Sequence, residues 1–360
     1  HYSLRESIMS RYVAVVTTIQ RPTKSLIKLQ EVVNKFMDKL IIVGDKKTPD
    51  QFFYDFPCDF YSLDDQHKFP FRLAKLLPVN HYSRKNIGYL LAMKNGADCI
   101  YETDDDNMPL KTWVLRNRIC TARIGSVTSN GWINIYDYFT DIFVWPRGFP
   151  LEKIRVFREN SAKEDIRSDS NNLFSINSPV QQGLVNGSPD VDSIWRLLYD
   201  TEITFKRQAS VSLPKNIWCP FNSQSTWWWS PAFPLMYLPS FCSFRMTDIW
   251  RSFVAIRCLW ELEYSVVFHS AEVWQERNIH NLINDFKEEI PGFLNNVAIT
   301  ETLTRLILEK GHHSVATNLY RCYEALVKKG FYPPEELKLL ANWIKDLTSI
   351  GILEPDRKYH

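Results

Sequence analysis

The sequence predicts an α/β fold with a mixed, mostly parallel sheet, and two observations carry this prediction. Over the first hundred residues, short β-branched runs of strand length alternate with amphipathic helical segments, as in sheets whose parallel strands are joined by right-handed crossovers. The chain has 360 residues and 45% hydrophobic content, which is enough for one large domain with an appended piece or for two ordinary domains.

The expected elements follow in chain order. Residues 12–18 (YVAVVTT) predict the first strand, and Thr23 is expected to cap a helix whose apolar residues recur at spacings of three and four. Residues 39–45 (KLIIVGD) and 58–62 (CDFYS) predict two more strands. Ser83 is expected to cap a helix that Gly96 ends in the left-handed conformation, and residues 98–103 (DCIYET) predict a fourth strand.

The second half of the chain is less regular. Residues 155–190 are rich in Ser, Asn and charge, which is typical of a long surface excursion. Aromatic residues gather in 217–250, and three consecutive tryptophans at 227–229 cannot all be buried on one face of a strand, so we expect at least one at a surface or cleft. After about residue 275 the apolar spacing becomes helical.

Composition and missing motifs exclude several classes of protein. The formal charge of +2 lacks the basic excess of nucleic-acid binders, so no nucleic acid is expected. Seven cysteines without a CxxC pair argue against a structural zinc site. The GxGxxG, GxxxxGK[ST], HExxH and GxSxG motifs are absent. No apolar run reaches 18 residues. Because the chain begins without Met, the possibility that a membrane anchor was removed from it stays open.

The segment YETDDDN at 101–107 places three acids behind a predicted strand. Neighbouring carboxylates raise one another's pKa unless a positive charge lies among them. If the backbone stays extended, Asp104 and Asp106 point the same way with Asp105 opposed, and their oxygens suit Mg²⁺ or Mn²⁺. The alternative is an acidic turn leading to Pro109, with Asp104 as a helix cap.

Two cations precede this strand. Arg84 and Lys85 fall in the first turn of the predicted helix, where free N–H groups and the helix dipole favour an anion. Plain solvated charge is the competing interpretation.

Several segments together resemble the STELLO-like glycosyltransferase family: VVTTIQRPT, LIIVGDKKTP, NHYSRKNIGYLLAMKNGADCIYETDDDN, QQGLVNGSPDVDSIWRL and FRMTDIWRSF. The middle block also resembles the broader GT-A pattern, an Asn-x-Gly helix followed by a strand and then DxD. The resemblance implies a GT-A-like, Rossmann-type nucleotide-sugar-binding domain at 11–275, with a nucleotide-sugar half at 11–150 and an acceptor half at 151–275. A helical C-terminal region at 276–360 follows.

The resemblance also implies roles for individual residues. Asp104 and Asp106 are expected to hold Mn²⁺ or Mg²⁺, with His269 as a further ligand, although a histidine after an apolar strand is commonly a hydrogen-bonded core residue. Asp105 is expected nearest the donor sugar or ribose. The nucleoside is expected near Thr17, Thr18, Arg21 and Asp45, and the diphosphate or sugar near Arg84, Lys85 and Asn86.

Asp190 and Asp192 are expected either to be acidic groups on the acceptor side of the site or to form a turn and a helix N-cap. Asp248 is expected either to be the base that deprotonates the acceptor or to be another N-cap. The implied function is metal-dependent transfer of a sugar from a nucleotide-sugar, with UDP-sugars favoured, to a hydroxyl of a glycan or glycoconjugate. The alternatives are an inactive scaffold and a metal-dependent nucleotidyltransferase. The Golgi lumen is expected for a membrane-anchored eukaryotic relative, and the cytoplasm otherwise.

Overall fold

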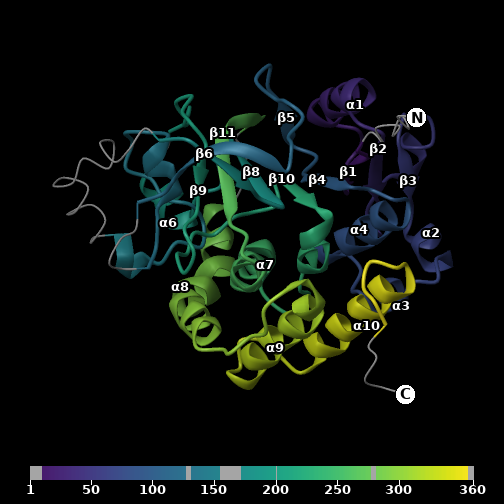
Figure 1. Cartoon of the computed structure of the whole chain (residues 1–360). Helices are drawn as coiled ribbons and strands as arrows, with labels where there is room; N and C mark the ends of the chain where they lie inside the picture. The colour runs from purple at the N-terminus through teal and green to yellow at the C-terminus, as the bar shows by residue number, and fades with distance from the viewer. Residues whose placement is uncertain (1–9, 127–130, 155–171, 200, 277–280, 356–360) are drawn as a thin grey trace, which may run out of the picture.

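A computed structural model describes residues 10–126, 131–154, 172–199, 201–276 and 281–355, and these contain one extended sheet (Figure 1). Its first half consists of four parallel strands in the order β3-β2-β1-β4. Their bounds are Tyr12–Thr17 for β1, Lys39–Val43 for β2, Asp59–Tyr61 for β3 and Cys99–Thr103 for β4. Each lies where the sequence predicts a strand.

The second half of the sheet is mixed. Strand β10 is antiparallel to both β4 and β8, so β8 and its parallel neighbour β11 run in the same direction as β4. Strands β9, β6 and β7 follow, and β5 pairs with β11. The bounds are β5 Asn107–Pro109, β6 Ile119–Ile124, β7 Phe174–Asn177, β8 Val180–Gly187, β9 Val211–Ser212, β10 Ser225–Trp229 and β11 Val266–Gln275. The predicted mixed α/β sheet is confirmed.

Helices cover both faces of the sheet (Figure 1). Helix α1 (Lys24–Phe36) packs on the face that carries Ala14 and Val16, whereas α4 (Lys85–Lys94) packs on the face that carries Val13 and Val15. This division follows from the alternation of side chains along a strand. Burial on both faces explains why the strands read as continuous apolar runs.

The remaining helices lie mostly on the α4 face. They are α2 Leu63–Lys68, α3 Arg72–Leu76, α6 Ser193–Leu198, α7 Thr247–Glu261, α8 Leu282–Thr304, α9 Val315–Lys328 and α10 Glu335–Ser349. The predicted helical C-terminal region is confirmed in α8 to α10, which share one hydrophobic core with α4 and α7. The division at residue 275 stays a prediction. None of the helices in the described ranges is long and apolar enough to cross a membrane.

The local capping predictions have mixed outcomes. Thr23 caps α1 by accepting the Leu26 N–H at 3.0 Å, and Gly96 has the expected positive φ of 78°. The prediction for Ser83 is wrong. It lies inside a short 3-10 turn, Tyr82–Arg84, where the His81 ring accepts the Ser83 N–H instead.

One prediction about surfaces is wrong, and another holds only in part. Trp227, Trp228 and Trp229 are all buried, because β10 is a central strand with a core on each of its faces. Within the predicted surface excursion at 155–190, residues 172–177 are mostly exposed, as expected, but β8 is another buried central strand. Residues 155–171 lie outside the described part of the chain.

Candidate functional site

A cavity of about 310 Å³ opens at the carboxyl ends of β1, β2 and β4. This is the edge at which ligands bind in open α/β sheets. The residues expected around the nucleoside and the metal, Arg21 and His269 excepted, line this cavity together. The lining residues are Thr17, Thr18, Ile19, Gln20, Val43, Gly44, Asp45, Lys47, Asn80, His81, Tyr82, Arg84, Asp104, Asp105, Asp106 and Phe244.

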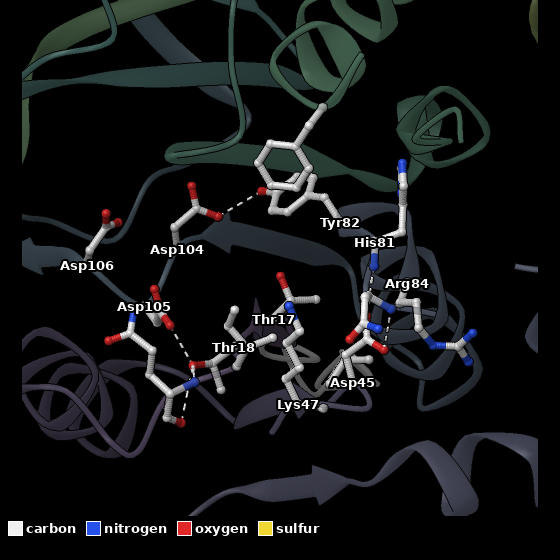
Figure 2. A pocket seen from close by; sticks show the side chains of 16 residues that line it. Thr17, Thr18, Asp45, Lys47, His81, Tyr82, Arg84, Asp104, Asp105 and Asp106 are labelled. Atoms are coloured by element: carbon white, nitrogen blue, oxygen red, sulfur yellow. Dashed lines mark hydrogen bonds between the residues drawn. The ribbon is translucent and has the colours of Figure 1, made fainter. Parts of the chain in front are cut away.

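The acidic run forms a turn rather than an extended strand end. The Asn107 N–H donates to the Asp104 carbonyl at 3.3 Å, which reverses the backbone before β5. In Figure 2, Asp105 points toward Thr18, whose hydroxyl donates to it, whereas Asp104 points toward Tyr82. The extended geometry expected for Asp104 and Asp106 is therefore absent, although all three side chains line the cavity.

Each acid in the turn is held by a different element. The Asp104 Oδ1 accepts the Tyr82 hydroxyl at 2.7 Å and the Lys85 Nζ at 3.0 Å. The Asp106 Oδ2 accepts the Gln275 Nε2 at 2.8 Å, so the end of β11 also reaches this site. The turn thus collects contacts from α4, the end of β11 and the segment before α4.

The electrostatics of the turn fit a hard divalent cation. Burial, and then the charges of Asp104 and Asp105, raise the pKa of Asp106 to about 7. Burial also raises the pKa of Asp105, with the charge of Asp104 adding to it. A cation among these oxygens would relieve both effects. The described residues contain no cluster of three or more His, Cys, Asp or Glu side chains arranged around a metal, so water and ligand oxygens would have to complete the coordination.

The opposite wall of the cavity is a hydrogen-bonded turn after β2. The Asp45 carboxylate accepts the backbone N–H groups of Lys46, Asn80 and His81 at 2.7 to 2.9 Å. Asn80 has a positive φ of 51°, which Asn tolerates better than most residues. Asp45 therefore shapes the cavity wall by binding backbone. Arg21, which was expected nearby, lies over the Phe52 ring at 4.1 Å and does not line the cavity.

Arg84 and Lys85, the two cations expected to bind the diphosphate, form hydrogen bonds with groups of the protein instead. The Arg84 guanidinium, 1% exposed, donates to the Gln66 Oε1 at 2.8 Å and to the carbonyls of Leu77 and Ala74. Figure 2 shows this group pointing away from the acids. Lys85 is fully buried and donates to Tyr82, to Asp104 and to the Thr103 carbonyl.

Asn86 does not reach the cavity. Its side chain donates to the Leu238 carbonyl at 2.8 Å and accepts the Leu238 N–H at 2.9 Å, so it ties α4 to the segment after β10.

The three acids expected on the acceptor side do not line the cavity. Arg147 binds Asp190 at 2.7 Å and Asp248 at 3.1 Å. Burial opposes ionisation of Asp248, but the charge and hydrogen bonds of Arg147 prevail and lower its pKa. Asp192 caps α6 through the Trp195 N–H at 2.9 Å, as the capping alternative predicts, and burial raises its pKa to about 7.

Asp248 is nevertheless connected to the acidic turn. Its Oδ2 accepts the Ser223 N–H at 3.2 Å and lies 3.2 Å from the Ser223 hydroxyl. The Ser223 hydroxyl also lies 2.6 Å from the Tyr82 hydroxyl, which donates to Asp104, so the single Ser223 proton goes either to Asp248 or to Tyr82. Burial, and then the charge of Asp104, raise the pKa of Tyr82, so the phenol keeps its proton and holds Asp104.

His269 lies within β11, where both of its ring nitrogens are satisfied. The Gln181 Nε2 donates to backbone carbonyls, so the Gln181 Oε1 is an acceptor and the His269 Nε2, 2.8 Å away, is the donor. The Nδ1 then accepts the Ser210 hydroxyl at 2.6 Å. His269 is not among the residues that line the cavity, which agrees with the core interpretation and gives no support to metal ligation.

The cavity residues that sequence reasoning missed include Lys47, His81, Tyr82 and Phe244. Lys47 follows Asp45 directly, and His81 and Tyr82 immediately precede Arg84, so proximity to candidate residues was the available signal. Phe244, 57% exposed, makes edge contacts with His81 and Tyr82 from a remote part of the sequence, and no local pattern pointed to it.

Comparison with known proteins adds two kinds of similarity. The model of the family "STELLO glycosyltransferases" matches residues 245–356. The chain is 27% identical to "Probable glycosyltransferase STELLO1" and 26% identical to "Probable glycosyltransferase STELLO2", both from Arabidopsis thaliana. Each alignment covers 95% of this chain but 45% of the relative, so the chain spans less than half the length of these proteins.

Solved structures give a more distant likeness. Glucosyl-3-phosphoglycerate synthase from Mycobacterium tuberculosis, in complex with phosphoglyceric acid, has a TM-score of 0.40 at 10% identity over 81% of each chain. The same enzyme with Mn²⁺, UDP-glucose and phosphoglyceric acid has a TM-score of 0.39, covering 81% of this chain and 80% of that one. The sequence matches confirm the resemblance carried by the motifs: the chain is similar to the STELLO glycosyltransferase model over residues 245–356 and to the two probable glycosyltransferases along 95% of its length.

Proposed function

We propose that this chain is the catalytic part of a metal-dependent glycosyltransferase. It would transfer a sugar from a nucleotide-sugar, with UDP-sugars favoured, to a hydroxyl of a glycan or glycoconjugate. The observation that carries the proposal is the meeting of Asp104, Asp105 and Asp106 with the ends of β1 and β2 around one cavity. The similarity to proteins named as probable glycosyltransferases supports the same reaction class.

The residues of the cavity suit the parts of such a donor. Asp104 and Asp106 would hold Mn²⁺ or Mg²⁺ through oxygen, and the bound cation would neutralise charge on the departing nucleoside diphosphate. The Asp45 turn forms the wall opposite Asp104 to Asp106, and Thr18 lies beside Asp105, so a nucleoside would fit between the turn and Thr18. Tyr82 and Lys85 fix one oxygen of Asp104 and leave its Oδ2 with no hydrogen-bond partner among the described residues.

Asp248 is better suited to positioning than to deprotonating the acceptor. Its lowered pKa and its ion pair with Arg147 weaken it as a base. Through Ser223 and Tyr82 it instead helps to orient Asp104.

Asp104→Asn and Asp106→Asn test the metal-dependent donor site. Wild-type protein is screened by thermal unfolding with UDP, GDP and their sugars, with and without Mn²⁺. A ligand present at a hundred times its Kd stabilises the native state by about 2.7 kcal/mol, which raises the melting temperature measurably. We expect this stabilisation to require Mn²⁺ and to disappear in both variants.

The controls separate loss of binding from loss of folding. Asp64→Asn, at an exposed position on α2, should bind as wild type does. Because the pKa of Asp106 is raised in the folded state, its charge destabilises the fold above the unfolded pKa, so Asp106→Asn without ligand should melt no lower than wild type. Mn²⁺-dependent nucleotide binding by either cavity variant would contradict the proposal. Release of pyrophosphate instead of a nucleoside diphosphate would indicate a nucleotidyltransferase.

A further inference from the structure

The cations around the cavity differ in how many of their donors are already used. A lysine ammonium has three donors, and those of Lys85 go to Tyr82, Asp104 and the Thr103 carbonyl. The Arg84 guanidinium is buried against Gln66 and two carbonyls. By contrast, no described residue forms a hydrogen bond or an ion pair with the Nζ of Lys47, which also lines the cavity. Lys47 is therefore the lining cation whose donors remain available to a ligand.

The backbone that carries Lys47 is fixed on several sides. Within residues 45–48, the Thr48 N–H donates to the Asp45 carbonyl at 2.9 Å, and the Thr48 hydroxyl donates to the Thr18 carbonyl at 2.7 Å. The Asp45 carboxylate binds the amides of Asn80 and His81 across the cavity wall. The turn is thus tied to the loops after β1 and before α4. These bonds fix the direction in which the Lys47 side chain leaves the backbone.

The Lys47 side chain extends from this turn toward the middle of the cavity (Figure 2). It faces an acid-rich space, since Asp45, Asp104, Asp105 and Asp106 share the lining. Each of these acids accepts hydrogen bonds from other groups, and none of them pairs with Lys47. A ligand that brings negative charge to Lys47 and ligand oxygens to a cation on the acids would satisfy both sides of the cavity.

We infer that Lys47 binds the diphosphate of the nucleotide donor, in place of the Arg84 and Lys85 that sequence position suggests. The inference rests on the proposed function and deepens it. A diphosphate carries enough charge to interact with a divalent cation and an ammonium group together, whereas an uncharged nucleoside offers Lys47 nothing to neutralise. Lys47 thus contributes affinity for the diphosphate of the donor and none for its nucleoside.

The test compares two adjacent lysines in the whole chain. Lys46 is also exposed but does not line the cavity, so Lys46→Gln is a matched control for Lys47→Gln. Calorimetric titration with UDP and GDP in the presence of Mn²⁺ measures the diphosphate, and NMR titration with uridine and guanosine measures the nucleoside alone. We expect Lys47→Gln to weaken binding of the nucleoside diphosphate about tenfold or more. Nucleoside binding should stay unchanged, and Lys46→Gln should behave as wild type.

Two further measurements sharpen the result. Lys47→Arg keeps the charge and should retain most of the affinity. Raising the salt concentration should weaken UDP or GDP binding more in wild type than in Lys47→Gln, because the screened interaction is absent from the variant.

The inference is overturned if Lys47→Gln binds UDP and GDP as wild type does, or if Lys46→Gln weakens their binding as much as Lys47→Gln does. It is also overturned if Lys47→Gln weakens the binding of uridine or guanosine as much as the binding of UDP and GDP. These results would leave the proposed function standing. Failure of wild type to bind either diphosphate would instead overturn the proposed function and this inference together.

Discussion

Arg84 and Lys47 show at the residue scale that hydrogen-bond partners decide whether a cation can bind a ligand. Arg84 directly precedes α4, whose first turn was its expected place, and its guanidinium donates to Gln66 and to the carbonyls of Leu77 and Ala74. Lys47 stands on a surface turn that sequence reasoning passed over. The sequence can identify cations near a predicted strand end. It cannot identify their partners, because Gln66, Leu77 and Ala74 reach Arg84 only through the fold.

His269 illustrates the same point and leads to a pH prediction. Burial, and then the charge of Arg116, lower its pKa well below 6.5. As the pH falls below about 6.5, the unfolded chain takes up a proton that the folded chain refuses, so the free energy of unfolding decreases. Between pH 7.5 and 5.0 this loss reaches about 2 kcal/mol, and His269→Gln should remove it.

Urea unfolding at the two pH values checks this prediction. The difference in stability between wild type and His269→Gln should be smaller at pH 5.0 than at pH 7.5. His67→Gln, at an exposed position, should leave the pH dependence unchanged. Mn²⁺ affinity should be the same in His269→Gln as in wild type, and a weakened affinity would return His269 to the list of metal ligands.

At the scale of elements, local patterns were sufficient where an element's neighbours are close in sequence. Strand β1, the Thr23 cap and the left-handed Gly96 depend on a few adjacent residues, and each is confirmed. Strand β10 depends instead on remote segments: it pairs with β8 and β4, and a core on each of its faces buries Trp227 to Trp229. The Trp prediction therefore failed because it treated one strand without its remote neighbours.

Helix α4 packs directly on the sheet at Gly88, where the helix contributes no side chain to separate the two backbones. A Cβ at position 88 would lie 2.5 Å from the Val15 Cγ1 and 2.8 Å from the Val43 Cγ2. Alanine is favoured over glycine in a helix by about 1 kcal/mol, but overpacking a core costs about 1 to 3 kcal/mol. Gly88→Ala should therefore lower the free energy of unfolding, as measured by urea denaturation.

A double-mutant cycle distinguishes crowding from other causes. Val15→Ala removes the nearer methyl group, so the double variant Gly88→Ala with Val15→Ala should be more stable than the sum of the single effects predicts. Simple additivity, or a Gly88→Ala variant as stable as wild type, would show that the helix can move away from the sheet at little cost.

At the scale of the whole molecule, buried polar networks join segments from distant parts of the chain. One runs from Asp104 through Tyr82 and Ser223 to Asp248 and Arg147. It connects the cavity with the second half of the chain, although Asp190 and Asp248 lie outside the cavity itself. Residues in the second half of the chain can therefore affect the acidic turn through hydrogen bonds.

A second network lies deeper in the core and carries the last prediction. The Arg251 guanidinium on α7 binds the Glu102 carboxylate on β4 at 2.6 and 2.9 Å, and the Trp228 Nε1 donates to the same carboxylate at 2.8 Å. Arg251 and Glu102 are 1% and 0% exposed, so Arg251→Met leaves a buried carboxylate without its cationic partner, although Trp228 and Tyr89 still donate to it. The expected loss of stability is about 3 to 5 kcal/mol, measured by chemical denaturation.

The comparison variants show why burial decides the size of this effect. Lys28→Met breaks the Lys28–Glu31 pair, whose side chains are 51% and 56% exposed, and should change stability by about 0.5 kcal/mol or less. Arg251→Met combined with Glu102→Gln removes the stranded charge and should recover part of the loss, because the unpaired carboxylate is its main cause. If Arg251→Met costs no more than Lys28→Met, the carboxylate must find another partner or water, and the pair does not hold α7 against β4.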